Sequence, residues 1–238
     1  MAERLSEMVA AAIGRRIVSG QYPPGETLPT EPKVQKEFGV SRTAVREAIR
    51  LLSAKGLTSS RPKIGTRVRP MVDWNMLDPD VLRWQIDQSP TEDFISNLFE
   101  MREIIEPAAS SRAAERATPA QLETLRVAME GISTLPRGTP EQIQADIDFH
   151  MEILEASRNP MLRSVGAAIQ SALSITFSIG WRTAMRDDAV IQHRAVYDAI
   201  VRRDGDEAFI AMRRLLRSSK GDVFDAISAS RREVEEIR

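Results

Sequence analysis

The 238-residue chain contains no cysteine, and this absence removes several kinds of chemistry. Without thiols the protein cannot form disulfides, bind a metal through thiolates or use a cysteine nucleophile, and it suits the reducing cytoplasm. No apolar run approaches the roughly 18 residues of a membrane span. The first residues, MAERLSEMV, lack the basic and then apolar regions of a signal peptide. We therefore expect a cytoplasmic protein that does not enter the membrane.

A strong net charge is also missing, since 33 Lys and Arg residues nearly balance 34 Asp and Glu residues. The balance hides an asymmetry. Residues 1–70 contain 13 Lys and Arg against 6 Asp and Glu, a net charge of +7, whereas the remainder has 20 against 28, or −8. A basic N-terminal part can neutralise DNA phosphates and release their counterions. The acidic remainder should stay off the duplex.

The N-terminal part does contain a predicted pair of short helices joined by a tight turn. One helix is expected over residues 31–38, Gly39 suits the turn, and Ser41 can cap a second helix that Gly56 ends. Basic side chains at the start of the second helix would then face outward, where an arginine can bind guanine or phosphate in the major groove. From these residues alone, an amphipathic helix pair with a solvated basic face is the alternative.

The flanking segments favour DNA binding. Upstream, apolar residues recur at helical spacing from Leu5 to Ile17, and Gly20 can end that helix. Downstream, residues 57–68 are predicted to form two short strands around a basic turn at residues 62–65. Three helices and a basic hairpin make a winged helix-turn-helix, whose wing glycine can approach a phosphate or the minor groove.

The rest of the chain is predicted to be helical. Residues 71–91 are expected to form a linker and a connecting helix that starts at Asp78-Pro79. The fold class is therefore mainly α, with a winged helix-turn-helix over residues 1–70 and an all-helical bundle over residues 92–234. The predicted bundle helices span residues 92–116, 119–134, 140–157, 160–181, 187–203 and 205–232.

A few polar side chains fall in the apolar stripes of these helices: Arg102, Asp146, His150 and His193. A buried charge costs several kcal/mol unless it is paired, so these residues should converge on an internal polar site. Each histidine could instead be a hydrogen-bonded core residue, and Asp146 with Arg102 a simple ion pair. The i, i+4 carboxylate and imidazole pair with a distant histidine suits Zn²⁺, Ni²⁺ or Mn²⁺ at Asp146, His150 and His193.

Three motifs occur in order in the N-terminal part: P-x-E at residues 29–31, V-S-R-x-x-V-R-E-A at residues 40–48 and G-x-x-V at residues 65–68. Together they resemble the DNA-binding domain of GntR-type bacterial transcription regulators. Pro32 stands where that family usually has an arginine, so one DNA contact is lost or passed to Lys33. From the helix pattern and this resemblance, the expected DNA-binding residues are Lys33, Ser41, Arg42, Thr43, Arg46, Lys63 and Gly65.

The bundle carries R-x-x-x-E-P at residues 102–107, D-x-x-x-H at residues 146–150, N-P at residues 159–160 and His193 in a later helix. This set is similar to the all-helical FCD effector domain of the FadR subfamily. In metal-binding members an Asp and three His hold the ion, and the ligand carboxylate completes the site. The third histidine position falls on Leu215 here, which leaves three protein ligands.

The junction D-W-N-M-L-D-P-D-V-L-R-W, together with Trp181, is similar to sugar-acid-responsive members of the subfamily. That resemblance implies a galactonate-like hexonate as effector. Arg102 would bind its carboxylate, Trp181 would pack against its carbon chain, and Asp146, His150 and His193 would hold hydroxyls or a metal.

We therefore predict a homodimeric transcription regulator, a repressor of sugar-acid catabolism that its effector releases from a palindromic operator in double-stranded DNA. The alternative is a metal-dependent enzyme that acts on a small hydroxy acid. Against it, the chain has no H-E-x-x-H, G-x-S-x-G or phosphate-loop motif.

Overall fold

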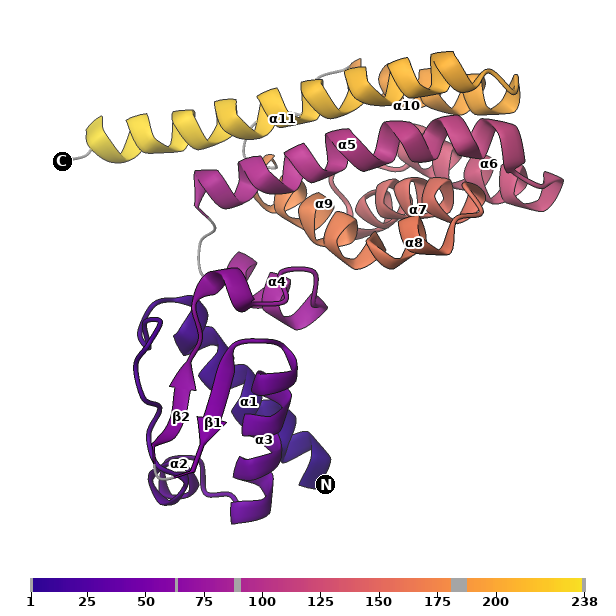
Figure 1. Ribbon diagram of the computed structural model, residues 1–238. Helices are drawn as coiled ribbons and strands as arrows, with labels where there is room; N and C mark the ends of the chain where they lie inside the picture. The colour runs from indigo at the N-terminus through magenta and orange to yellow at the C-terminus, as the bar shows by residue number, and fades with distance from the viewer. Residues whose placement is uncertain (1, 63, 88–90, 181–187, 237–238) are drawn as a thin grey trace. The chain divides into compact units, whose positions relative to one another are not determined.

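The structure, a computed structural model, describes residues 2–62, 64–87, 91–180 and 188–236. It is mainly helical and divides into two compact units, Met1–Pro90 and Thr91–Arg238. The predicted fold class is confirmed, because a helix-turn-helix unit with a two-stranded wing precedes an all-helical bundle (Figure 1). Among the described residues, no helix is long and apolar enough to cross a membrane.

The N-terminal unit contains the predicted helices and the predicted hairpin. Gly39, between the second and third helices, has a φ of 65°, in the left-handed region that glycine enters at little cost. The two strands pair antiparallel, with Thr58 opposite Val68 and Arg61 opposite Gly65. In chain order the elements are α1 (Ala2–Val18), α2 (Glu31–Phe38), α3 (Arg42–Ala54), β1 (Thr58–Arg61) and β2 (Gly65–Val68).

Helices α1 and α3 share the core of this unit. Leu5 and Met8 of α1, which follow the helical spacing of apolar residues, are 39% and 47% exposed, so the buried apolar stripe of α1 begins at Val9. The buried cluster includes Val9, Ile13 and Ile17 of α1 and Val45, Ala48 and Leu52 of α3.

The segment after the hairpin adds the 3-10 turn η1 (Met71–Asp73) and helix α4 (Pro79–Asp87) to the N-terminal unit. Trp84 of α4 is buried in the same cluster as α1 and α3. It lies against Gly14 of α1 so closely that a Cβ on Gly14 would be 2.2 Å from the indole ring. Residues 71–87, predicted as linker and connecting helix, thus contribute to the N-terminal core.

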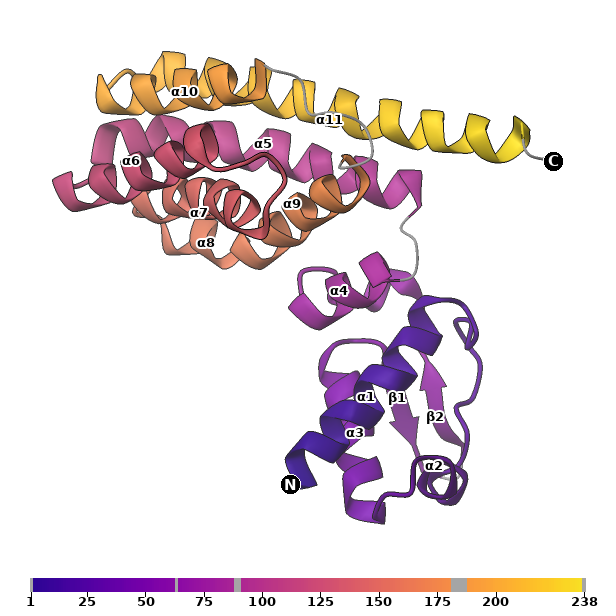
Figure 2. The same ribbon diagram turned by 180° about the vertical axis from the view of Figure 1, so that it is seen from behind.

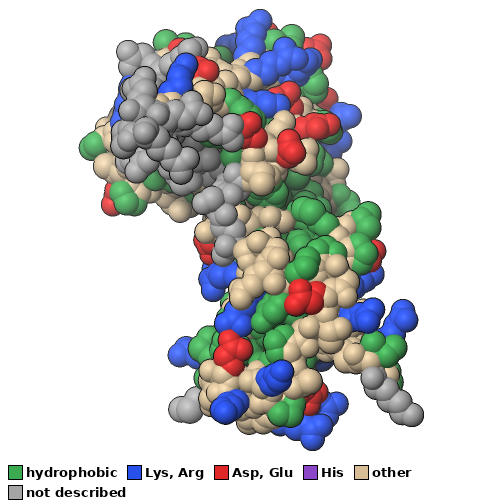
Figure 3. Space-filling model, turned by 90° about the vertical axis from the view of Figure 1, so that its left-hand side faces the viewer, with side chains coloured by type: hydrophobic (Ala, Val, Ile, Leu, Met, Phe, Trp, Pro, Cys, Tyr) green, Lys and Arg blue, Asp and Glu red, His purple; other side chains and the backbone are tan. Residues whose placement is uncertain are grey.

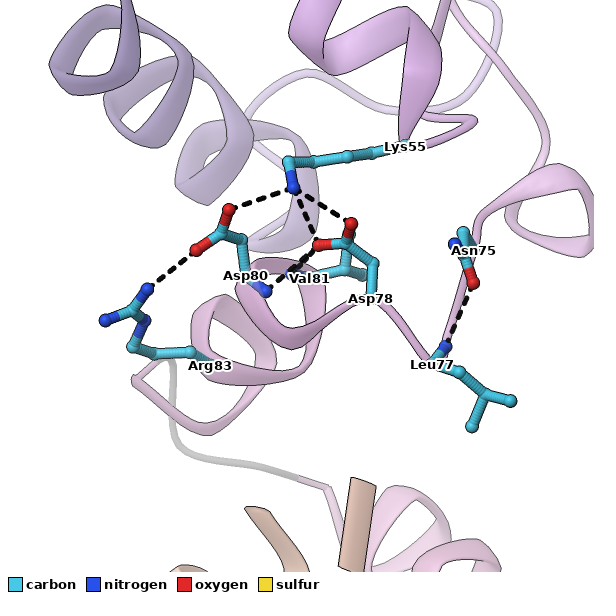
Figure 4. A network of polar contacts seen from close by, with 7 residues as sticks. All are labelled: Lys55, Asn75, Leu77, Asp78, Asp80, Val81 and Arg83. Carbon is cyan, nitrogen blue, oxygen red and sulfur yellow. Dashed lines mark hydrogen bonds and ion pairs between the residues drawn. The ribbon is translucent and has the colours of Figure 1, made fainter. Parts of the chain in front are cut away.

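Charged contacts also hold α4 to the end of α3 (Figure 4). The Nζ atom of Lys55, directly after α3, lies 2.8 Å from Asp78 Oδ1 and 2.9 Å from Asp80 Oδ2. Asp78 Oδ1 also accepts the backbone N–H groups of Asp80 and Val81, which caps α4. Burial alone would lower the pKa of Lys55, but Asp78 and Asp80 raise it. Burial alone would raise the pKa of Asp80, but Lys55 and Arg83 lower it.

Seven helices of the C-terminal unit fall within the described residues. Figures 1 and 2 both show α11 lying alongside α5, and α10 alongside α11. Threonine side chains cap three of the helix starts, at residues 91, 118 and 139, by accepting a backbone N–H. The helices are α5 (Glu92–Arg116), α6 (Pro119–Thr134), α7 (Pro140–Ala156), α8 (Pro160–Ser164), α9 (Gly166–Gly180), α10 (Asp188–Val201) and α11 (Gly205–Glu236).

One predicted helix is divided. The expected helix over residues 160–181 is two helices, α8 and α9, which meet at Val165. Gly166 starts α9, and a Cβ there would lie 2.4 Å from Met151 Cε of α7. Glycine is a poor helix former, and here its missing side chain allows the close approach of α7. The single-helix prediction was therefore wrong at this point.

Candidate functional site

Helix α3 presents a basic outer face on the N-terminal unit. Ser41 caps the helix, and its Oγ accepts the backbone N–H of Ala44 at 3.3 Å. Ala44, Val45 and Ala48 form the buried side of the helix, whereas Arg42, Thr43 and Arg46 are exposed on its outer side. Blue Lys and Arg side chains are visible over the N-terminal unit in the lower part of Figure 3. This face has the side chains that a major groove requires.

Glu31, at the first turn of α2, faces both of these arginines. Its Oε2 accepts Arg42 Nε at 2.9 Å, and its Oε1 lies 3.9 Å from Arg46 Nε. The arginine side chains are 72% and 68% exposed, so these pairs contribute little to stability. They place a carboxylate of the neighbouring helix α2 beside both guanidinium groups. Sequence reasoning used Glu31 only as part of a motif and missed this contact.

The remaining predicted DNA-binding residues belong to α2 and the wing. Lys33 is exposed on α2. Gly65 begins β2 with a φ of 95°, and a Cβ there would lie 3.3 Å from Thr27 Cγ2. Lys63 lies outside the described residues. Exposed Ile64 completes the described part of the wing tip.

A cluster of buried ionisable side chains lies inside the C-terminal unit. All four predicted polar core residues are in it, because α5, α7 and α10 pack the relevant faces together. Their exposed fractions are 5% or less. The cluster consists of Arg102 and Glu106 of α5, Asp146 and His150 of α7, and His193 of α10.

Glu106 joins Arg102 to His150. Its Oε1 accepts Arg102 Nε at 2.6 Å, and its Oε2 lies 2.5 Å from His150 Nδ1. Burial alone would raise the pKa of Glu106, but the charges of Arg102 and His150 lower it to about 2. An ionised carboxylate only accepts hydrogen bonds, so His150 Nδ1 must carry the proton and donate it. The Nε2 atom of His150 then turns toward Asp146.

His193 is held in the same way by a different acceptor. Its Nδ1 lies 2.7 Å from the carbonyl oxygen of Ala189, which also can only accept. Its Nε2 lies 3.3 Å from Asp146 Oδ2, while His150 Nε2 lies 3.5 Å from Asp146 Oδ1. The carboxylate of Asp146 thus lies between two imidazole Nε2 atoms.

Electrostatics in this cluster follow from burial and proximity. Burial alone would raise the pKa of Asp146, but His193 and then His150 and Arg102 lower it. For His193, burial would lower the pKa, but Asp146 raises it above its usual value. The pair therefore favours a carboxylate facing an imidazolium when no other ion is bound.

The residues present fit a divalent metal ion. One ligand atom from each of Asp146, His150 and His193 lies within 4.8 Å of the other two. The Nε2 atom of His193 is buried and, although it lies 3.3 Å from Asp146 Oδ2, makes no hydrogen bond of good geometry to the residues that the structure describes. One carboxylate and two imidazoles suit Zn²⁺, Ni²⁺ or Mn²⁺ better than Mg²⁺. Leu215, at the expected third-histidine position, is 3% exposed in the apolar core.

Arg102 offers a second binding feature. Its Nε donates to Glu106, but its Nη1 is buried without a hydrogen-bond partner in the described part of the chain. A guanidinium donor in this state suits a carboxylate ligand. Trp181, predicted to contact the same ligand, lies outside the described residues. Glu106 was not among the predicted site residues, although its i, i+4 spacing from Arg102 was a signal for it.

Comparisons with known families cover both units. Residues 5–68 match the family described as "Bacterial regulatory proteins, gntR family", and residues 97–218 match the FCD domain. Among solved structures, the chain is 25% identical to Streptococcus agalactiae GntR, with a TM-score of 0.51 over 92% of this chain and 99% of that one. Listeria monocytogenes Lar has a TM-score of 0.63 at 21% identity, over 92% and 96% of the two chains, and supports the fold alone.

Three curated relatives from Escherichia coli K12 extend over most of the chain. The uncharacterized HTH-type transcriptional regulator YieP is 38% identical, over 91% of this chain and 94% of its own. The galactonate operon transcriptional repressor is 35% identical, over 90% and 94%. The HTH-type transcriptional repressor NanR is 30% identical, over 91% and 83%.

Proposed function

Because this chain belongs to the gntR family of bacterial regulatory proteins and carries an FCD domain, we propose that it is a repressor that a small sugar acid releases from DNA. It is a transcription regulator and not a metal-dependent enzyme. Two of its relatives are described as repressors, one of them of a galactonate operon. A galactonate-like hexonate is therefore the effector that we propose, and a regulator of bacterial genes would act in the cytoplasm.

The observation that carries this proposal is the buried Arg102 guanidinium, whose Nη1 has no hydrogen-bond partner among the described residues. A hexonate has a carboxylate at one end and hydroxyl groups along its chain. Arg102 would bind the carboxylate, since N–H donors of a guanidinium match carboxylate oxygens. Asp146, His150 and His193 would bind hydroxyls directly or through a metal ion. Trp181 stays a predicted contact of the carbon chain.

A divalent ion at Asp146, His150 and His193 would supply positive charge and open coordination positions for the oxygen atoms of the effector. The three side chains would hold the ion, and the two histidines are already oriented for this because their Nδ1 atoms contact Glu106 and the carbonyl oxygen of Ala189. With three protein ligands, the ion should be held less tightly than by four. Removal of the ion by a chelator should therefore weaken effector binding.

On DNA, the proposed contacts are Arg42, Thr43 and Arg46 of α3, with Lys33, Ser41, Lys63 and Gly65 beside them. A homodimer would place two α3 helices in successive major grooves of a palindrome, about one helical turn apart. If effector and operator favour different arrangements of the dimer, each must weaken the binding of the other by the same factor.

The test is fluorescence anisotropy of a labelled duplex from the gene's own upstream region, at fixed salt and protein concentration, during titration with D-galactonate. Release of the duplex supports the repressor and the acid class together. D-Galactose, which has the same hydroxyl configuration but lacks the carboxylate, is the matched control ligand and should leave the duplex bound. If galactonate also leaves it bound, the proposed acid is wrong.

A further inference from the structure

Glu106 belongs to the buried cluster, but the proposed contacts with the effector and the metal ion do not include it. It nevertheless has two charged neighbours on different elements. Its Oε1 contacts Arg102 on its own helix, and its Oε2 contacts His150 on α7, 44 positions away. Both side-chain neighbours are hydrogen-bond donors, and Glu106 is 1% exposed.

From this geometry we infer that Glu106 is a positioning residue that presents His150 Nε2 to a metal ion and Arg102 Nη1 to an anionic ligand. This inference rests on the proposed function, because it assigns a supporting residue to the proposed effector site. By accepting the Nδ1 proton, Glu106 leaves Nε2 as the ligand atom that faces Asp146. By occupying Arg102 Nε, it leaves Nη1 as a donor without a partner in the part of the chain that the structure describes.

The chemistry of the side chain explains why a carboxylate is required. Each of its oxygens accepts from one donor, and both donors are buried. A glutamine would have the same shape but only one accepting oxygen, so its NH₂ group would face either Arg102 Nε or His150 Nδ1 as a second donor. A carboxylate that orients a metal-binding histidine typically contributes 10- to 100-fold to metal affinity.

The first test uses the unaltered protein without metal. Long-range ¹H–¹⁵N NMR reports which ring nitrogen of His150 carries a proton. We expect a proton on Nδ1, where Glu106 accepts it. A proton at Nε2 alone would overturn the inference. Because this measurement needs no variant, metal or effector, it is independent of the proposed function.

The second test compares Zn²⁺ affinity by calorimetry. Glu106→Gln should weaken Zn²⁺ binding by about 10- to 100-fold and move the His150 proton resonance. Glu100→Gln, on the exposed face of α5, is the matched control and should change neither. Circular dichroism checks that both variants fold; if Glu106→Gln does not, the NMR result on the unaltered protein decides.

The outcomes of these tests distinguish the positioning role of Glu106 from the proposed metal site. Equal Zn²⁺ affinities for the folded Glu106→Gln variant and the unaltered protein would overturn the positioning role. If the unaltered protein binds no Zn²⁺ but His150 is protonated at Nδ1, the proposed metal site is wrong. Glu106 would then still determine which ring nitrogen of His150 carries the proton.

Discussion

At the scale of single residues, the arginines of α3 differ in the acidic residue that each one contacts. Arg42 and Arg46 face Glu31 of the neighbouring helix, whereas Arg50 pairs within its own helix, with Glu47. All three are largely exposed. The first two therefore contact α2 near the start of α3, the part of a recognition helix that typically contacts base edges.

We expect Arg46→Ala to lose specific operator binding while effector affinity stays unchanged. Loss of a guanidinium that binds a base should cost about 1–3 kcal/mol of binding free energy. Arg50→Ala, on the same helix, is the control and should weaken binding less. Fluorescence anisotropy with operator and scrambled duplexes measures both effects. An Arg46→Ala variant that loses effector binding as well would show that Arg46 has a structural role.

Gly14 is a second residue whose environment decides the effect of a substitution. Ala is normally better than Gly inside a helix by about 1 kcal/mol. At Gly14, however, the new Cβ would lie 2.2 Å from the ring of Trp84, which is buried at 2% exposure. We expect Gly14→Ala to destabilise the protein by about 1–3 kcal/mol because of this overpacking.

Gly221→Ala provides the opposite case, since nothing lies within 4 Å of the corresponding Cβ on α11. It should be neutral or stabilising by up to about 1 kcal/mol. Urea unfolding monitored by tryptophan fluorescence compares the two variants. Equal stabilities would mean that Trp84 does not pack on Gly14.

At the scale of elements, α4 is joined to the helix-turn-helix by a core and a set of charges. Trp84 packs on α1, and Lys55 at the end of α3 contacts Asp78 and Asp80. The Lys55 side chain is 16% exposed, so these ion pairs are better shielded from water than the pairs on α3. Helix α4 should therefore unfold together with the N-terminal unit.

Lys55→Met tests the charged part of this connection, and its effect should depend on pH. The pKa of Asp80 is lowered in the folded protein, so its contribution is present above its ordinary value of 3.8 and is lost as the pH falls. The pKa of Lys55 is raised, so its contribution is present below 10.5 and is lost as the pH rises beyond that. Near neutral pH the substitution should cost about 1 kcal/mol.

Urea unfolding of the unaltered protein and Lys55→Met between about pH 3 and pH 8 measures this difference, which should shrink below about pH 4. Arg83→Met removes a more exposed partner of Asp80 and should cost less. A pH-independent difference would indicate that Lys55 stabilises α4 through its contact with the Trp84 ring rather than through its ion pairs with the two aspartates.

At the scale of the whole molecule, the two kinds of ligand should respond differently to salt. The N-terminal 70 residues carry a net charge of +7 and the remainder −8. DNA binding releases counterions, so the logarithm of operator affinity should fall linearly with the logarithm of salt concentration, with a slope of about −0.9 per neutralised phosphate. The proposed effector site is buried and should be screened far less.

Parallel titrations at about 50 and 200 mM salt check this prediction, with anisotropy for operator and calorimetry for D-galactonate. Operator affinity should fall by more than tenfold, and galactonate affinity should change only slightly. Scrambled duplex is the control and should show the same slope, because phosphates carry no sequence. A flat response for the operator would exclude binding through the basic N-terminal unit.

The sequence by itself determined several helix boundaries and the identity of the buried polar residues. Helix α2 was predicted with its observed ends, residues 31–38, and so were α5 at residues 92–116 and α6 at residues 119–134. Helix caps, prolines and apolar spacing depend on residues within one or two helical turns, so they predict helix ends without knowledge of tertiary contacts. The polar residues Arg102, Asp146, His150 and His193 were also visible, because each interrupts an apolar stripe.

Tertiary structure alone decided how those residues meet. The contact between Glu106 and His150 spans 44 positions, and neither residue's own helix specifies it. The pairing of Glu31 with Arg42, the packing of Trp84 on Gly14 and the break before Gly166 likewise depend on neighbouring helices. The physical reason is that sequence spacing determines which side of a helix a residue occupies, whereas packing between helices determines what lies opposite.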